Sequence, residues 1–116
     1  MGTTMGRQVM QAVLRASYDR LSDVLYISLG AAVPNEGEGI PNGIELNYAL
    51  ETGNPCGVTI IGYRLYEWPN HLDELGAIIG RHLGVSRLRV EEAIRSVAGA
   101  MPPPDPAANT RTNRSK

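Results

Sequence analysis

The apolar residues of this chain change their spacing once, near Trp68-Pro69, and that change constrains the fold more than any other feature. Residues 12–68 contain short apolar segments between turn-forming residues, and in the clearest of them, 43–50, apolar side chains recur at every second position, which is typical of β-strands. In residues 70–101 they recur at every third or fourth position, which is typical of amphipathic helices. A run of strands followed by a run of helices predicts an α+β domain.

The β part predicts an antiparallel sheet of about four strands, formed by two hairpins. Its clearest strand is 43–50, in which every second side chain is apolar: Ile44, Leu46, Tyr48 and Leu50. The turn-rich stretch 51–55 then predicts a hairpin into a strand within 57–66, where Gly62 indicates a bulge.

A second hairpin is expected upstream. Strands at 14–18 and 24–29 flank the turn 19–23. Between the two hairpins, residues 30–42 contain three glycines and two prolines. That composition predicts an exposed loop.

The helical part, 70–101, predicts a hairpin of two helices. Asn70 is the expected N-cap of the first helix and Ser86 of the second, while Gly84 suits the left-handed turn between them. The first apolar stripe is Leu72, Leu75, Ile79 and Leu83, and the second is Val90, Ile94, Val97, Ala98 and Met101. Both stripes are expected to pack on the sheet or on a partner chain.

These patterns predict a single domain, 12–101, between two looser ends. Residues 1–11 are expected to be a flexible N-terminus, and the proline-rich 102–116 a disordered tail. The chain shows neither the apolar core of a secretory signal nor roughly 20 consecutive apolar residues that would span a bilayer. A cytoplasmic protein without membrane contact is therefore expected.

Charge is unevenly distributed along the chain. The formal net charge is −1, but residues 1–69 hold four arginines against seven acids, a balance of −3. Residues 70–101 are balanced, and the tail carries +2. The net charge of −1 argues against a uniformly cationic protein that binds nucleic acid or membranes. Any affinity for phosphate is expected in the C-terminal half of the chain.

The stretch Tyr18–Leu29, YDRLSDVLYISL, resembles a family of small bacterial proteins known as a domain of unknown function. Gly43-Ile44-Glu45-Leu46, Glu51-Thr52-Gly53 and the Gly57–Gly62 strand continue the resemblance, which covers residues 13–66. It implies a compact β-meander. Members of the family are suspected to be antitoxin-like partners of a small toxin, so the resemblance also implies a protein-binding role.

Residues 79–94, IGRHLGVSRLRVEEAI, resemble a helix-turn-helix. A small residue, Gly80, lies four positions before the turn glycine, and apolar residues flank that glycine. The resemblance implies DNA recognition, with Ser86 capping the second helix and Arg87 and Arg89 near its N-terminal end. Because Glu91 and Glu92 would face the same groove and oppose phosphate, a structural or dimerising hairpin is the favoured interpretation.

Few side chains suggest chemistry. Asp19 and Asp23 favour turn formation, with a calcium or magnesium site or an acid–base pair as the alternative. His71 and His82 would lie roughly 16 Å apart along one helix, too far to share an ion. Cys56, the one cysteine, is expected to be a small buried residue. No nucleophile elbow or phosphate loop occurs, so neither an enzyme nor a cofactor is expected.

Three functions from different classes remain open at this point. The favoured one is a non-enzymatic protein-binding module that forms a homodimer and presents Glu36 and Glu38 to a small basic protein. The second is a DNA-binding regulator that uses 79–94. The third is an enzyme or metal-binding protein centred on Asp19 and Asp23.

Overall fold

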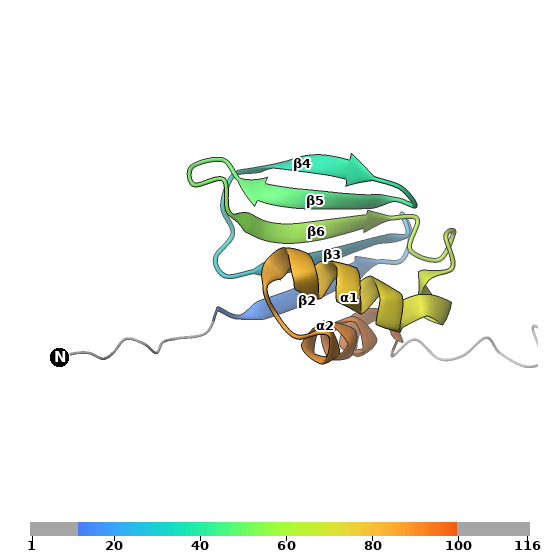
Figure 1. Cartoon of the computed structure of the whole chain (residues 1–116). Coiled ribbons are helices and arrows are strands. Elements are labelled where there is room, and N and C mark those ends of the chain that lie inside the picture. Colours follow the sequence, from blue (N-terminus) through green and yellow to red (C-terminus); the bar gives the residue numbers. More distant parts are fainter. Residues whose placement is uncertain (1–11, 100–116) are drawn as a thin grey trace, which may run out of the picture.

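The computed structural model describes residues 12–99, and the predicted flexible N-terminus 1–11 and tail 102–116 lie outside this range. The described chain is an α+β domain, as predicted: an antiparallel sheet followed by two helices (Figure 1). The strands are β2 (Leu14–Asp19), β3 (Val24–Leu29), β4 (Asn35–Ile40), β5 (Ile44–Ala49) and β6 (Pro55–Ile61). A 3₁₀ turn (Trp68–His71), α1 (Leu72–Leu83), α2 (Arg87–Ile94) and a π-turn (Arg95–Gly99) follow. No helix in this range is both long and apolar enough to cross a bilayer.

The sheet has five strands in the order β2-β3-β6-β5-β4, all antiparallel. The expected count of about four is therefore wrong by one strand. The additional strand is β4, which lies within 30–42, the segment predicted to be a loop. Its sequence, NEGEGI, contains only one apolar residue and therefore shows no alternating pattern.

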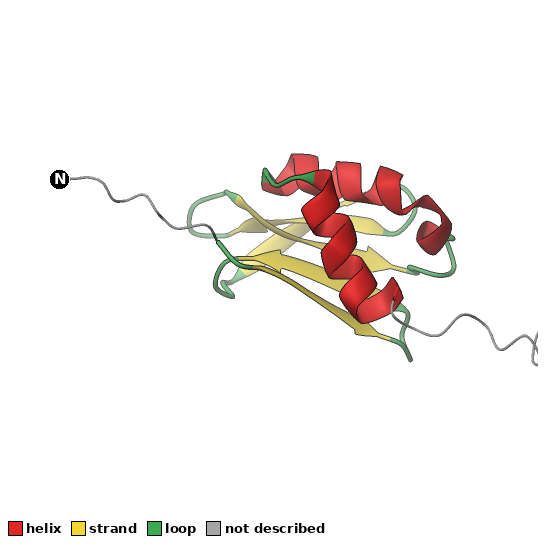
Figure 2. Cartoon of the chain, turned by 90° about the horizontal axis from the view of Figure 1, so that it is seen from below, coloured by secondary structure: helices red, strands yellow, loops and turns green. Residues whose placement is uncertain are grey.

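Both helices cover the same face of the sheet (Figure 2). The inward side chains of β3 and β6 meet the predicted apolar stripes of the helices in one core, whose fully buried members include Leu25, Val58, Ile60, Leu75, Ile79, Val90 and Ile94. α1 packs on β6, whereas α2 and the π-turn pack on β2. The helices therefore lie over β2, β3 and β6 and leave β4 at the far side of the sheet (Figure 1).

The predicted helix caps are confirmed at the turn between α1 and α2, but the predicted N-cap of α1 is wrong. Gly84 adopts the left-handed conformation (φ 74°), and the hydroxyl of Ser86 accepts a hydrogen bond from the Arg89 amide at 3.1 Å, as expected of an N-cap. Asn70 is not the N-cap of α1. It lies in the 3₁₀ turn, and His71 precedes α1 without a side-chain cap, because Pro69 starts a tighter turn first.

The two helices approach closely at two glycines of α1. A Cβ atom at Gly80 would lie 2.6 Å from the carbonyl oxygen of Val85, and one at Gly76 would lie 2.9 Å from Cγ of Glu91. Val85 belongs to the turn between the helices and Glu91 to α2, so glycine is required at Gly80 for the turn and at Gly76 for the contact with α2. Of the second apolar stripe, Val90, Ile94 and Ala98 are buried, and Met101 lies outside the described residues.

The strand expected within 57–66 ends earlier, at Ile61. Gly62 is not a bulge: it turns the chain away from the sheet in the left-handed conformation (φ 81°). The irregularity of this sheet lies instead where β5 pairs with β6: Asn47 is opposite Gly57 and Tyr48 is opposite Pro55, so Cys56 of β6 is the extra residue.

Candidate functional site

The outer edge of β4 has backbone groups that pair with no other strand among residues 12–99. β4 is the last strand of the sheet, and Asn35–Gly39 are all exposed. The Leu50 amide donates to the Pro34 carbonyl at 2.9 Å, which fixes the alternation of the antiparallel ladder. Even-numbered residues of β4 therefore pair with β5, and the N–H and C=O groups of Asn35, Gly37 and Gly39 point outward. A neighbouring extended chain could bond to them.

Glu36 and Glu38 lie on this strand rather than in a loop. They stand opposite Tyr48 and Leu46, on the side of the sheet that carries the helices, and both are exposed. The Tyr48 hydroxyl donates weakly to Glu38 at 3.4 Å; burial and the Glu38 charge raise the Tyr48 pKa. β4 and β5 together hold three glutamates and no cation, so this end of the sheet is acidic. We use "β4 edge" for the outward backbone groups of residues 35, 37 and 39 together with the two carboxylates of residues 36 and 38.

The other face of the sheet carries no helix from the described part of the chain (Figure 2). Its centre is polar and shallow, with the side chains of Ser28, Asn47 and Thr59 beside a hollow of about 330 Å³. Thr59 donates to Asn47 at 3.1 Å across β5 and β6, which fixes those two side chains. On β4 this face presents Asn35, Gly37 and Gly39. The Glu45 side chain lies over Gly37, whereas a Cβ atom at Gly39 would have no atom within 4 Å, so the open space lies at the Gly39 end of the strand.

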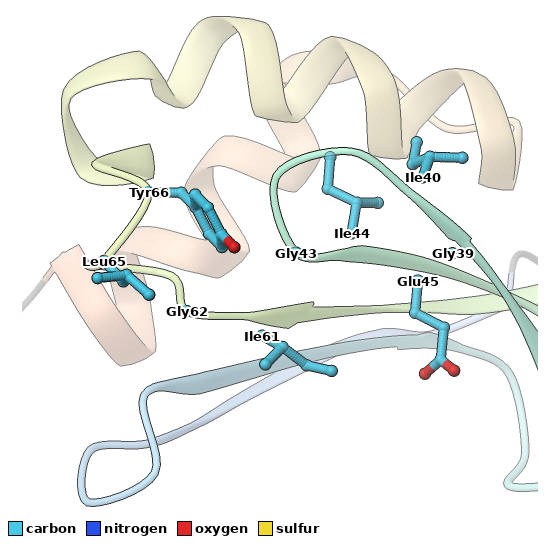
Figure 3. A pocket seen from close by; sticks show the side chains of 9 residues that line it. All are labelled: Gly39, Ile40, Gly43, Ile44, Glu45, Ile61, Gly62, Leu65 and Tyr66. Carbon is cyan, nitrogen blue, oxygen red and sulfur yellow. The ribbon is translucent and has the colours of Figure 1, made fainter.

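An apolar hollow of about 340 Å³ adjoins the C-terminal end of β4 (Figure 3). Its walls include Ile40, Ile61, Leu65 and Tyr66, and we call it the Tyr66 hollow. Figure 3 shows Ile40 pointing toward the helices and Ile61 pointing away from them, so the hollow lies around the end of the sheet. Leu65 is 74% exposed and Ile61 54%, although both are large apolar side chains. Such a group of exposed apolar residues is typical of a binding surface.

Asp23 fixes the chain segment that forms this hollow. Its carboxylate accepts hydrogen bonds from the amides of Arg64 (2.9 Å) and Leu65 (3.1 Å) and from the Tyr18 hydroxyl (2.7 Å). Its own carbonyl accepts from Gly62 and Tyr63. Burial acts to raise the Asp23 pKa, but these donors outweigh burial and lower it. Burial, with help from Asp23, raises the pKa of Tyr18 to about 12.

The turn after β4 is held against the same segment. The Trp68 indole donates to the Asn42 carbonyl at 3.0 Å, and the Tyr66 ring lies over Gly43 and Gly62, where a Cβ atom would be 3.1 and 3.0 Å from it. The Tyr66 hollow is therefore built by contacts between segments more than twenty residues apart in sequence.

A second hollow, of about 470 Å³, adjoins the N-terminal end of β4. Val33, Pro34, Ala49 and Leu50 line it, and Leu50 is 58% exposed. We call it the Leu50 hollow. Leu50 was expected on the inward face of its strand, but β5 ends at Ala49, so Leu50 begins the turn and faces solvent. The β4 edge thus has an apolar hollow at each end and two carboxylates between them.

The helix-turn-helix-like residues lie elsewhere, on the first turn of α2. Ser86 caps the helix, Arg89 is exposed, and the Arg87 guanidinium pairs with the Glu91 carboxylate. Glu91 was expected to face outward together with Glu92, but it does not. It is 4% exposed, it packs against α1, and Arg95 also pairs with it, at 3.2 Å. Arg87 and Arg95 compensate the charge of this buried carboxylate.

Asp19 and Asp23 take separate structural roles. Asp19 accepts hydrogen bonds from the amides of Leu21 and Ser22, which makes the predicted turn, and its bonds with Ser22 lower its pKa. Asp23 was expected to bond the local backbone in the same way, but it bonds the distant segment after β6 instead. Within residues 12–99, no three His, Cys, Asp or Glu side chains come together as a metal site.

The remaining candidates also have structural contacts. His82 lies 3.1 Å from the Asn47 carbonyl and packs edge-on against the Tyr48 ring. Cys56 was expected to be buried; it is half-buried on β6, and desolvation raises the pKa of its thiol. Neither residue approaches the β4 edge in any interaction found in the structure.

Comparison of the chain with protein-family models, with curated proteins and with solved structures finds no match. The resemblance to the family of unknown function therefore stays a prediction. Function has to be inferred from the geometry of the chain itself.

Sequence reasoning found Glu36 and Glu38 but missed the strand that carries them and the two hollows beside it. One signal for the strand was present. Asn42-Gly43 follows Ile40-Pro41, and both residues adopt positive φ (70° and 83°), as Asn-Gly does in tight hairpins. For the hollows the sequence offers no comparable signal, because they depend on contacts between distant segments.

Proposed function

We propose that this protein is a non-enzymatic binding module that adds an extended, basic segment of another protein to its sheet at the β4 edge. The observation that carries the proposal is the β4 edge itself: an end strand with outward backbone groups and two exposed glutamates. Strand addition supplies affinity through main-chain hydrogen bonds, and side chains along the edge supply selectivity.

Charge supports a basic partner. Glu36, Glu38 and Glu45 are the charged residues of β4 and β5. A strand laid along β4 would place alternate side chains next to Glu36 and Glu38, where cations are favourable and acids are not. Surface charge of this kind also steers a cationic partner toward its site and increases the association rate.

Charge also argues against a second copy of this chain at the same edge. Antiparallel pairing of β4 with β4 of another copy, centred on Gly37, would place Glu36 of each opposite Glu38 of the other. Like charges directly opposite destabilise a strand pair. Homodimerisation stays a prediction of the sequence, and we expect it to use another surface.

The test begins with capture of partners from the native host by the tagged protein, after nuclease treatment, with mass spectrometry as the readout. The wild type is compared with Glu36→Lys/Glu38→Lys and with Glu74→Lys/Glu92→Lys, which makes the same change in net charge on exposed helix positions. We expect one stoichiometric protein that the first variant loses and the second keeps.

Amide hydrogen exchange on the purified complex then locates the contact. The amides of Asn35, Gly37 and Gly39 should become protected, because strand addition turns them into donors. A partner that both charge variants retain equally, or protection confined to other elements, would rule out the β4 edge as the binding site.

DNA binding through 79–94 remains a second candidate. It is supported by the turn at Gly84, the Ser86 cap and the exposure of Leu88 and Arg89 at the start of α2. Binding of a labelled duplex should weaken steeply with salt and drop in Arg87→Ala/Arg89→Ala. Affinity that the double variant leaves unchanged would exclude this candidate.

A further inference from the structure

We infer that the partner segment carries two large apolar side chains, five or six residues apart, with two cations between them. This inference rests on the proposed strand addition and specifies what the β4 edge selects. It follows from the position of the Leu50 hollow and the Tyr66 hollow at opposite ends of the same strand.

The spacing follows from strand geometry. The Leu50 hollow reaches β4 at Pro34, and the Tyr66 hollow reaches it at Gly39 and Ile40. At about 3.3 Å per residue, these points are roughly 17–20 Å apart. A strand paired with β4 has the same rise, so side chains five or six residues apart would meet both hollows. The residues between them would pass Glu36 and Glu38.

The size and composition of the hollows fit large apolar side chains. Each hollow exceeds about 300 Å³, which is the lower end of the range for small-ligand pockets. Their walls are mainly apolar, with Leu50 exposed in one hollow and Ile61, Leu65 and Tyr66 in the other. One carboxylate also lines each hollow, Glu51 in the first and Glu45 in the second. Burying the apolar surface would add affinity that the carboxylates of the β4 edge alone cannot supply.

This pattern favours a partner protein over the cationic tail of the chain itself. Residues 102–116 contain Arg111, Arg114 and Lys116, but their only non-proline apolar residues are two alanines. The tail therefore has no large side chain for either hollow. It also contains no pair of apolar residues at the required spacing.

The probe is a synthetic peptide with Leu-Ser-Lys-Thr-Lys-Ser-Leu between Gly-Ser flanks. Three relatives replace the first, the last or both leucines by serine, and a fourth places the leucines three residues apart. Binding to the full-length protein is measured by fluorescence anisotropy. We expect each correctly spaced leucine to improve affinity roughly tenfold, because its side chain would be partly buried in a hollow.

Variants of the protein assign each leucine to a hollow. Leu50→Ser and Leu65→Ser remove exposed walls, so they should leave the fold intact, and Leu21→Ser, at a fully exposed turn, is the matched control. Leu50→Ser should cancel the benefit of one leucine and Leu65→Ser that of the other, while Leu21→Ser changes neither. The pairing also gives the direction of the bound strand.

The outcomes separate this inference from the proposed function. If peptides with and without leucines bind equally well, and binding is lost in Glu36→Lys/Glu38→Lys, the two-anchor pattern is wrong and strand addition stands. If Leu21→Ser reduces binding as much as the wall variants do, the hollows are not the anchor sites. If Glu36→Lys/Glu38→Lys binds the peptides as well as the wild type does, the proposed function is wrong too.

Discussion

The two end strands of the sheet, β2 and β4, differ in what surrounds them. On β2 every second side chain packs against the core beneath α2 and the π-turn: Leu14, Ala16 and Tyr18. On β4 five of the six residues are exposed, and only Ile40 packs against the core. Both strands are extended and hydrogen-bonded on one side. The difference indicates that the β2 end contributes to the core, whereas the β4 end leaves most of its side chains exposed.

The largest difference in stability is expected between alanine substitutions of two adjacent residues that lie on opposite faces of β6. Ile60 is fully buried and Ile61 is 54% exposed. Ile60→Ala should reduce the free energy of unfolding by about 2–5 kcal/mol because it leaves a cavity in the core. Ile61→Ala should cost less than about 1 kcal/mol. Denaturant unfolding of both variants measures the difference, and equal losses would contradict the assignment of the two faces.

The elements that the sequence predicts correctly are those whose side chains are buried in the core. Leu75, Ile79 and Leu83 follow a helical period because each must reach the same buried surface, and they are buried as expected. The same reasoning holds for the strands of the first hairpin, 14–19 and 24–29, where inward positions alternate. Local chemistry was equally informative at Gly84 and Ser86, since a cap and a left-handed turn depend on single residues.

The features that the sequence does not predict, β4 and the two hollows, are exposed to solvent. β4 gains its extended conformation from pairing with β5, and a strand exposed on both faces needs no apolar alternation. The hollows escape prediction for another reason: Leu65, in the wall of the Tyr66 hollow, is held by Asp23, 42 residues earlier in the chain. Glu36 and Glu38 were noticed for their charge alone, and charge does not distinguish a loop from an edge strand.

Asp23 connects the β2 end of the sheet with the β4 end, because it belongs to the β2–β3 turn and holds the segment that forms the Tyr66 hollow. Asp23→Asn keeps one acceptor oxygen and tolerates the left-handed backbone (φ 61°), but it loses the negative charge. We expect a loss of about 1–3 kcal/mol in stability at neutral pH. We also expect weaker binding of the two-leucine peptide, and reduced dependence on Leu65.

The pH dependence of that loss has a defined sign. The folded-state pKa of Asp23 lies below its ordinary value of 3.8, so the ionised carboxylate stabilises the fold above about pH 4. This contribution disappears as pH falls through the folded-state pKa. Unfolding at pH 7 and pH 3 should therefore show the wild type approaching Asp23→Asn at the lower pH. A gap independent of pH would mean that Asp23 acts through shape rather than charge.

Two glycines compare the covered and uncovered regions directly. Gly80→Ala would place a Cβ atom 2.6 Å from a backbone oxygen, so α1 and α2 would have to separate. The cost of overpacking should exceed the gain in helix propensity and leave a net loss of about 1–2 kcal/mol. Gly39→Ala meets no atom within 4 Å and should stabilise by up to about 0.5 kcal/mol, because the unfolded chain loses freedom. Thermal unfolding tests both signs.

Tyr18 and Tyr63 are in edge-to-face contact, with ring centres 5.4 Å apart. Removal of the hydroxyl group should change the stability of the fold differently at the two positions. Tyr18→Phe removes a donor to Asp23 and should cost about 1 kcal/mol. The Tyr63 hydroxyl is buried without a hydrogen-bond partner among residues 12–99, and burial raises its pKa to about 12. Tyr63→Phe should therefore be neutral or slightly stabilising. A loss in Tyr63→Phe equal to that in Tyr18→Phe would reveal a partner for this hydroxyl.

The smallest effect on stability, and the clearest on association, is expected from Glu36→Val/Glu38→Val. Both side chains are exposed, and valine favours strands, so the free energy of unfolding should change by less than about 0.5 kcal/mol. However, charges on an end strand keep it from pairing with other copies, and valines would make β4 a template for that pairing. Light scattering should show concentration-dependent association of this variant but not of Glu74→Val/Glu92→Val. If the β4 variant stays as dispersed as the wild type, the two charges are not what keeps this end strand from pairing with other copies.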